Sequence, residues 1–251
     1  MDIYQEFASV YDVLTEDVDY DSNVKYLEHI LEKHLAFKPH LIAELACGTG
    51  NITKRLADKG YDVIGIDLAE DMLNVAREKC DDSVLLLNQD MTDFELYGTV
   101  DAVLCLLDSV NYIESEEKLL KMFRLVENYL EFGGAFVFDI NSGYKLREVL
   151  SNNTFVRETE KVVSVWENEQ DEGCVHFYLN FFLETDNGMY RRFYEEHTEY
   201  VYEIDKIVFL LEKAGFINIT CYAENTFHAP DAKTERIYFV ANKKGKKLEI
   251  N

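Results

Sequence analysis

The amino-acid sequence predicts an α/β fold in which a doubly wound sheet is interrupted by an antiparallel insertion. Short apolar runs alternate with helical patterns between residues 41 and 140. A pair of glycines, Gly48 and Gly50, follows the first run and precedes a helical pattern. Between residues 154 and 203, β-rich stretches replace this alternation. Strands that alternate with helices pair in parallel through right-handed crossovers, whereas consecutive strands pair in antiparallel hairpins.

The first half of the chain supplies the first three strands and the helices around them. Apolar residues recur at helical spacing in the first forty residues, which read as helix until Pro39. After residue 40 we expect, in order, a strand at 41–46, a helix to about Lys59, a strand at 62–67, a helix at 70–79 and a strand at 84–88.

The pattern continues with two more strands around one long helix. We expect a strand at 100–106, an amphipathic helix at 116–130 and a strand at 135–140. Gly133 and Gly134 should end that helix before the last of these strands begins. Because the strands are apolar and flanked by helices, the sheet should be covered on both faces.

The remaining residues divide into the insertion and the end of the sheet. Asp186-Asn187-Gly188 predicts a hairpin turn inside the insertion. A helix at 205–214 ends at Gly215, strands at 217–223 and 236–241 complete the sheet, and a basic tail should be solvated. We therefore assign 1–153 and 204–251 to one core, with a helical cap at 1–38, and 154–203 to a β-rich insertion.

Composition and charge limit the function classes to consider. Of the 251 residues, 47% are hydrophobic and 29% are charged, as in ordinary globular proteins. The chain has 25 basic and 48 acidic residues, a net charge of −23. This charge repels phosphates and argues against bulk binding to nucleic acid or to an anionic membrane. No apolar run approaches the length of a membrane span.

The cysteines and the N-terminus indicate a cytoplasmic protein. The chain has five cysteines, an odd number without a CxxC pair, and six histidines that show no metal spacing, so we expect no metal. Several cysteines lie in apolar runs, as expected in a reducing compartment. The acidic and aromatic N-terminus lacks the features of a signal peptide.

The clearest functional signal is the glycine loop and an acidic residue beyond it. Gly48 and Gly50 let the backbone turn tightly and approach a ligand. Asp67 ends the second strand at the same edge of the sheet, where a carboxylate can accept hydrogen bonds from a ribose. A dinucleotide-binding loop would have a third glycine where Thr53 stands, and a P-loop would continue with Gly-Lys.

These motifs resemble those of the class I S-adenosylmethionine (SAM)-dependent methyltransferases, over roughly residues 4–140 and the closing strands. The resemblance implies a Rossmann-like seven-stranded sheet of order 3-2-1-4-5-7-6 with the last strand antiparallel. It also implies that Asp67 holds the ribose, that Met72 lies near the adenine, and that Asp90 and the Met91 backbone N–H contact the adenine. The other cofactor-binding residues that it implies are Tyr11, Tyr20, Glu44, Ala46, Gly48, Gly50, Leu106 and Ser109.

In the acceptor half of such a site, we expect Tyr11, Asn111 and His197 to take part. Methyl transfer mainly requires alignment, with a base only where the acceptor must lose a proton. Similar sugar-amine N-methyltransferases have a histidine near the place of Asn111, which cannot act as a base. His197 shares one predicted strand face with Phe193 and Glu195 and is a possible base, although a surface strand of charge pairs would show the same pattern.

The predicted function is transfer of a methyl group from SAM to a small-molecule acceptor, which leaves S-adenosylhomocysteine. The aromatic residues of the insertion would line a lid over the acceptor or form a homodimer contact. The alternatives are a SAM-binding sensor, another group transferase of the same fold and, disfavoured by Thr53, an NAD-dependent oxidoreductase.

Overall fold

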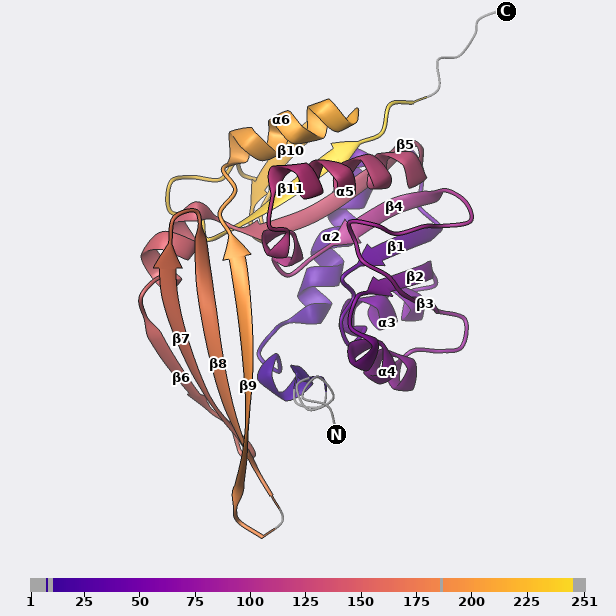
Figure 1. Cartoon of the computed structure of the whole chain (residues 1–251). Coiled ribbons are helices and arrows are strands. Elements are labelled where there is room, and N and C mark those ends of the chain that lie inside the picture. The colour runs from indigo at the N-terminus through magenta and orange to yellow at the C-terminus, as the bar shows by residue number, and fades with distance from the viewer. Residues whose placement is uncertain (1–7, 9–10, 186, 246–251) are drawn as a thin grey trace, which may run out of the picture.

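The computed structural model describes residues 8, 11–185 and 187–245, and it contains two separate sheets (Figure 1). The larger sheet has seven strands in the order β10-β11-β5-β4-β1-β2-β3, and the smaller sheet has four in the order β6-β7-β8-β9. The strands of the larger sheet are β1 Leu41–Leu45, β2 Asp62–Asp67, β3 Leu85–Asn88, β4 Val100–Cys105, β5 Leu130–Asn141, β10 Ile217–Ala223 and β11 Arg236–Asn242.

The strand order and the pairing confirm the predicted Rossmann-like sheet. β1 pairs in parallel with both β2 and β4, and β4 pairs in parallel with β5. β11 runs antiparallel to both of its neighbours. The strand order therefore changes direction between β1 and β4, with β2 and β3 on one side and β5 on the other. At this point the carboxyl ends of the parallel strands lie at one edge of the sheet.

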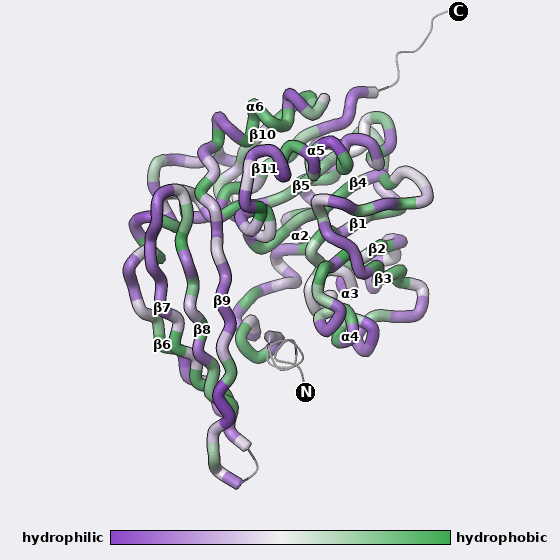
Figure 2. Tube along the Cα trace, in the orientation of Figure 1, coloured by the Kyte–Doolittle hydropathy of each residue, from purple (hydrophilic) through white to green (hydrophobic). Residues whose placement is uncertain are grey.

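Helices cover both faces of the larger sheet. The helices are α2 Tyr20–His34, α3 Asn51–Asp58, α4 Glu70–Lys79, α5 Glu116–Tyr129 and α6 Ile204–Ala214. One apolar cluster joins α5 and α6 to one face of the sheet, and a second joins α2 and α3 to the other. The most apolar stretches of chain run through this sheet, as Figure 2 shows.

The N-terminal segment and the start of β5 differ from the sequence-based expectations. The first forty residues are not one helix: residues 11–14 are helical, a turn follows, and α2 begins at Tyr20. Asp19 caps α2 by accepting a hydrogen bond from the Ser22 N–H. β5 begins at Leu130, before Gly133 and Gly134, so the glycines lie inside the strand.

The insertion forms one antiparallel sheet that is joined to the core at one end and projects away from it (Figure 1). Its strands are β6 Thr154–Glu158, β7 Val162–Asp171, β8 Cys174–Glu184 and β9 Tyr190–Tyr200. A short π-helical segment, η2 Lys145–Leu150, leads into it from β5 and was not expected. Asp186 of the predicted turn and the end of the basic tail lie outside the described residues.

Within the described residues, no helix has the length and apolarity needed to span a membrane.

Candidate active site

The glycine loop joins β1 to α3 at the carboxyl edge of the sheet. Gly48 and Gly50 both adopt positive φ angles, 55° and 76°, which glycine tolerates without strain. A Cβ on Gly50 would lie 3.0 Å from the Cβ of Ala76, so α4 packs closely against the loop only because this side chain is absent. A Cβ on Gly48 would meet no atom within 4 Å, so the space above it is open to a ligand.

Asp67, at the end of β2, is hydrogen-bonded to the glycine loop. Its carboxylate accepts a hydrogen bond from the Gly48 N–H at 2.7 Å and another from the Ala69 N–H at 2.8 Å. Burial raises the pKa of this carboxyl, and the backbone donors oppose that effect. A carboxylate has about four lone-pair positions, so two remain for the hydroxyls of a ribose.

Glu44 and Thr53 form a buried pair beneath the loop. Glu44 is 4% exposed and accepts a hydrogen bond from the Thr53 hydroxyl. Burial raises the pKa of Glu44 to about 8. Thr53, which stands where a dinucleotide-binding loop would place its third glycine, thus has a specific partner in this chain.

The segment before α2 is attached to the glycine loop by Asp12, a residue that the sequence analysis did not identify. Its carboxylate accepts hydrogen bonds from the Thr49 hydroxyl at 2.7 Å and from the Asn51 amide at 2.9 Å. It also pairs with Lys79 of α4 at 2.5 Å. These contacts hold the neighbouring Tyr11 over the loop.

A pocket beside Gly48, the glycine-loop pocket, collects many of the predicted cofactor-binding residues. Those that line it are Tyr11, Tyr20, Glu44, Ala46, Gly48, Leu106 and Ser109. The Tyr20 hydroxyl is buried, and the side chains of Thr15 and Asn51 lie near it. This polar atom and the open backbone at Gly48 both fit a polar ligand such as the cofactor that the resemblance implies.

The predicted adenine contacts lie at the neighbouring strand ends. Asp90 follows β3 and accepts hydrogen bonds from the Thr92 N–H and hydroxyl, both through its Oδ1 atom. Met91 packs against Cys105 of β4, and Met72 lies half-buried on α4. None of these three lines the glycine-loop pocket.

The turn after β4 is held in an unusual conformation by a buried ion pair. Leu107 and Asp108 both have positive φ angles, which side chains rarely adopt. Their N–H groups donate to the carboxylate of Asp139 on β5, at 3.0 and 2.7 Å. Arg236 of β11 pairs with both Asp139 and Asp108. Strain of this kind is frequent at functional sites, and these partners are too distant in the sequence to be predicted.

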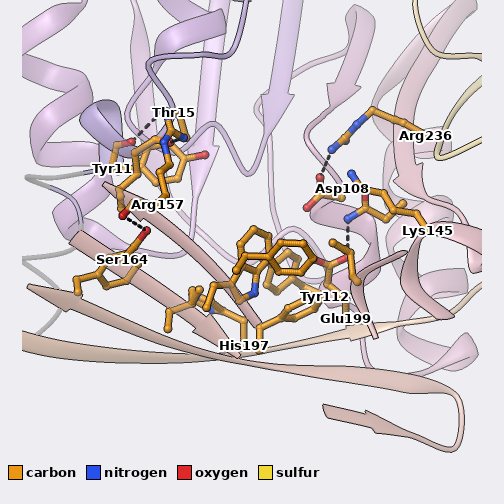
Figure 3. Close-up of a pocket in the computed structure, with 18 residues that line it drawn as sticks. Tyr11, Thr15, Asp108, Tyr112, Lys145, Arg157, Ser164, His197, Glu199 and Arg236 are labelled. Atoms are coloured by element: carbon orange, nitrogen blue, oxygen red, sulfur yellow. Dashed lines mark hydrogen bonds and ion pairs between the residues drawn. The ribbon is translucent and has the colours of Figure 1, made fainter. Parts of the chain in front are cut away.

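A second and larger pocket, the lid cavity, lies between the core and the inner face of the insertion (Figure 3). Its volume is about 340 Å³. Trp166, Phe177 and Phe181 contribute an aromatic wall, whereas Asp108, Lys145 and Arg236 contribute charge from the core. Tyr11 lines both this cavity and the glycine-loop pocket, so the two pockets adjoin at its side chain.

Two titratable residues of β9 face the lid cavity. His197 lies there, so its strand face is the one that looks into the cleft, and Figure 3 shows it beside Tyr112. Burial lowers the pKa of His197, so its imidazole is neutral at pH 7. Glu199, which the sequence analysis missed, is 4% exposed and accepts a hydrogen bond from the Asn141 amide at 2.8 Å. Burial, assisted by Asp108, raises the pKa of Glu199 to about 8.

Asn111 does not lie in either pocket. Its amide donates to the carbonyl oxygens of Asn141 and Tyr200, and its oxygen accepts from the Asn141 N–H. The side chain is fully buried and joins β5 to the end of β9. The structure therefore gives Asn111 a role in holding the insertion against the core, and no acceptor-facing atom.

Comparison with known proteins places these features in context. A family model described as a methyltransferase domain matches residues 42–134. YqeM of Bacillus subtilis strain 168, whose name reads "Putative methyltransferase YqeM", is 36% identical over 246 residues, or 96% of this chain and 97% of that protein. An S-adenosylmethionine-dependent methyltransferase from Clostridium acetobutylicum has a crystal structure that covers 97% of this chain and 100% of its own, with a TM-score of 0.86 and 34% identity.

A further relative is similar over less of its length. A dTDP-3-amino-3,6-dideoxy-alpha-D-glucopyranose N,N-dimethyltransferase from Streptomyces fradiae is 33% identical over 116 residues, which is 45% of each chain.

Proposed function

This chain belongs to the S-adenosylmethionine-dependent methyltransferases, and from that premise we propose that it methylates a small-molecule acceptor bound in the lid cavity. One observation carries the proposal: Tyr11 lines both the glycine-loop pocket and the lid cavity. A cofactor held at the first pocket and an acceptor held in the second would meet at this side chain.

The residues on the cofactor side fit SAM. Asp67 would bind the ribose, Asp90 the adenine amine, and the open backbone at Gly48 the methionine portion. When bound, SAM supplies an electrophilic methyl group on a positively charged sulfur. Asp12 and the Asp139–Arg236 pair hold Tyr11 and the 106–109 turn around this place, and such alignment is the main catalytic requirement.

The lid cavity offers a volume of suitable size for the acceptor, an aromatic wall beside it and residues that can accept a proton. A volume of about 340 Å³ lies within the range of small-molecule sites, and the net charge of −23 disfavours a nucleic acid strand as acceptor. The aromatic wall of Trp166, Phe177 and Phe181 would shield one side of a bound acceptor from water. Neutral His197 is able to accept a proton, and so is Glu199 once it has ionised above about pH 8.

The experiment that tests this proposal follows the label from methyl-labelled SAM. The purified protein is incubated with an extract of its source organism, which is then separated into small molecules and macromolecules. We expect the label in the small-molecule fraction. Label found only in protein or nucleic acid would contradict the proposal.

A cavity-filling variant tests the location of the acceptor. Leu179 lines the lid cavity, whereas the next residue, Tyr178, lies on the opposite face of β8. We expect Leu179→Trp to lose transfer and to keep S-adenosylhomocysteine binding, and Tyr178→Trp to keep both. Equal activity of the two variants would place the acceptor elsewhere.

The outer face of the insertion supports a second proposal, that two copies of the chain associate through it. Tyr194 is 40% exposed and Val156 is 67% exposed, although both lie on strands. Sedimentation of the protein with and without Tyr194→Glu tests this, and a monomer at all concentrations would contradict it.

A further inference from the structure

We propose that Asp171, Cys174 and His176, at the hairpin between β7 and β8, form a binding site for a zinc-type transition-metal ion. This site lies outside the catalytic pockets, and the inference does not depend on the identity of the methyl acceptor. One ligand atom from each residue, a carboxylate oxygen, a thiol sulfur and an imidazole nitrogen, lies within 4.8 Å of the other two. These donor types suit zinc, whereas magnesium and calcium prefer oxygen ligands alone.

The strand register explains how three residues of one short sequence become neighbours. Asp171 pairs directly with Cys174 across the hairpin. Cys174 and His176 are two residues apart on β8, so their side chains point to the same face of the sheet. The spacing Asp-x-x-Cys-x-His does not match a zinc-finger pattern, which is why the sequence analysis expected no metal.

The distance between sulfur and nitrogen fits tetrahedral coordination. The Cys174 Sγ atom lies 3.7 Å from the His176 Nε2 atom. In a tetrahedral zinc site, with bonds of about 2.3 Å to sulfur and about 2.0–2.1 Å to nitrogen, the two ligands lie about 3.6 Å apart. A rotation of the exposed Asp171 side chain would bring the third ligand into place, and water would take the fourth position.

His176 is also oriented as a metal ligand should be. Its other ring nitrogen, Nδ1, lies 3.0 Å from the hydroxyl of Thr198 on β9, the residue directly opposite His176 in the register. In the tautomer that carries its proton on Nδ1, the ring donates to this hydroxyl and keeps the Nε2 lone pair directed at the site, an arrangement typical of metal-binding histidines.

The local charge favours a cation. The carboxylate of Asp171 lies close to the sulfur of Cys174, so the two groups would repel each other if both were ionised. A divalent ion would remove this repulsion and stabilise the thiolate. Glu169 faces His176 in the strand register and adds to the negative field.

The position of the site suggests what a bound ion would do. The Gly173 carbonyl accepts a hydrogen bond from the Val201 N–H, just after β9, so the hairpin lies at the junction of insertion and core. An ion held there would fasten β7 and β8 at the end of the insertion nearest the core, beside the path from β9 to α6.

Titration of the protein, without an affinity tag, with Co²⁺ and then Zn²⁺ tests the proposal. We expect one Co²⁺ per chain, a near-ultraviolet band from thiolate-to-cobalt charge transfer, and loss of that band when Zn²⁺ displaces the cobalt. Binding of cobalt without this band, or no saturable binding of either metal, would overturn the assignment.

Matched variants identify the ligands. We expect Cys174→Ser and His176→Ala to weaken zinc binding by more than tenfold, and Thr198→Val, which acts through His176, by about tenfold. Glu172→Gln and Cys221→Ser remove an adjacent carboxylate and another half-buried thiol and should bind as the parent protein does. Unchanged S-adenosylhomocysteine binding shows that each variant is folded. Equal zinc affinity of Cys174→Ser and the parent would refute the site.

Discussion

The core sheet and the sheet of the insertion differ in how their apolar side chains are buried. The core sheet is covered on both faces by helices and by two large apolar clusters. Among the described residues, only the inner face of the insertion packs against other residues, through two small apolar clusters beside the lid cavity. Its outer face has large exposed side chains. A sheet covered on both faces provides a rigid frame for a cofactor, whereas a sheet covered on one face can shape a cavity for a variable ligand.

The largest expected effect is a loss of unfolding free energy when a stacked phenylalanine is removed from the core sheet, compared with the same change in the insertion. Phe138 in the core is fully buried between Phe136, at a ring distance of 4.7 Å, and Phe239, at 5.0 Å. We expect Phe138→Ala to lower the free energy of unfolding by about 3–5 kcal/mol. Phe181→Ala in the insertion should cost less, because its cluster has three buried members among the described residues and adjoins a cavity. Urea unfolding measures both, and an equal loss would contradict the contrast.

A pH series sharpens the comparison through two buried glutamates, Glu44 in the core and Glu199 in the insertion. Burial raises the pKa of each to about 8 in the folded chain, above the ordinary value of 4.5. Between these values the folded protein holds protons that the unfolded chain has released, so its stability falls as pH rises. The loss from pH 5 to pH 9 should be on the order of 3 kcal/mol for Glu44.

The isosteric variants provide the measurement. Glu44→Gln should flatten the decrease of melting temperature between pH 5 and pH 9 more than Glu199→Gln does, because Glu199 borders a cavity. If neither variant changes the pH dependence, the two carboxyls titrate normally.

Loss of the Asp67 carboxylate should weaken S-adenosylhomocysteine binding by about 1–3 kcal/mol, since ribose hydrogen bonds are removed. Calorimetric titration of Asp67→Ala measures this, with Asp90→Ala as a second test at the adenine end. Glu199→Gln is the matched control in the insertion and should leave cofactor binding unchanged. Binding to Asp67→Ala that equals the parent's would contradict the predicted role of this residue.

The smallest expected effect is a change in melting temperature when either of two glycines with positive φ is replaced by alanine. Gly215 ends α6 at φ 110°, and Gly188 lies in the outer hairpin of the insertion at φ 72°. An added Cβ meets only ordinary contacts at Gly215 and none at Gly188, so backbone strain of about 1 kcal/mol is the main cost. We expect Gly215→Ala to lower the melting temperature by a few degrees and Gly188→Ala to lower it less, because strain at a remote turn is relieved locally.

The residues that local patterns could identify are those whose role depends on position along a strand or loop. Gly48, Gly50 and Asp67 follow apolar runs, and the carboxyl ends of parallel strands meet at one edge. Alternation placed His197 on one strand face with Phe193 and Glu195, but only the structure showed that this face looks into the lid cavity. Local patterns could not predict the contacts of the Asn111 side chain, because its three hydrogen-bond partners are backbone groups that lie far from it in the sequence.

Local patterns in the sequence predicted the class of fold and the edge of the sheet at which a ligand would bind, because periodicity and glycine placement are local properties. The order of the strands came from the resemblance to a known family. Only the tertiary structure decided which groups share the acceptor side. Glu199, Asn141, Asp108 and Arg236 are drawn together from β9, β5, the turn after β4 and β11. The interactions of buried charges depend on distance in space and not on separation in sequence, so no local pattern contains them.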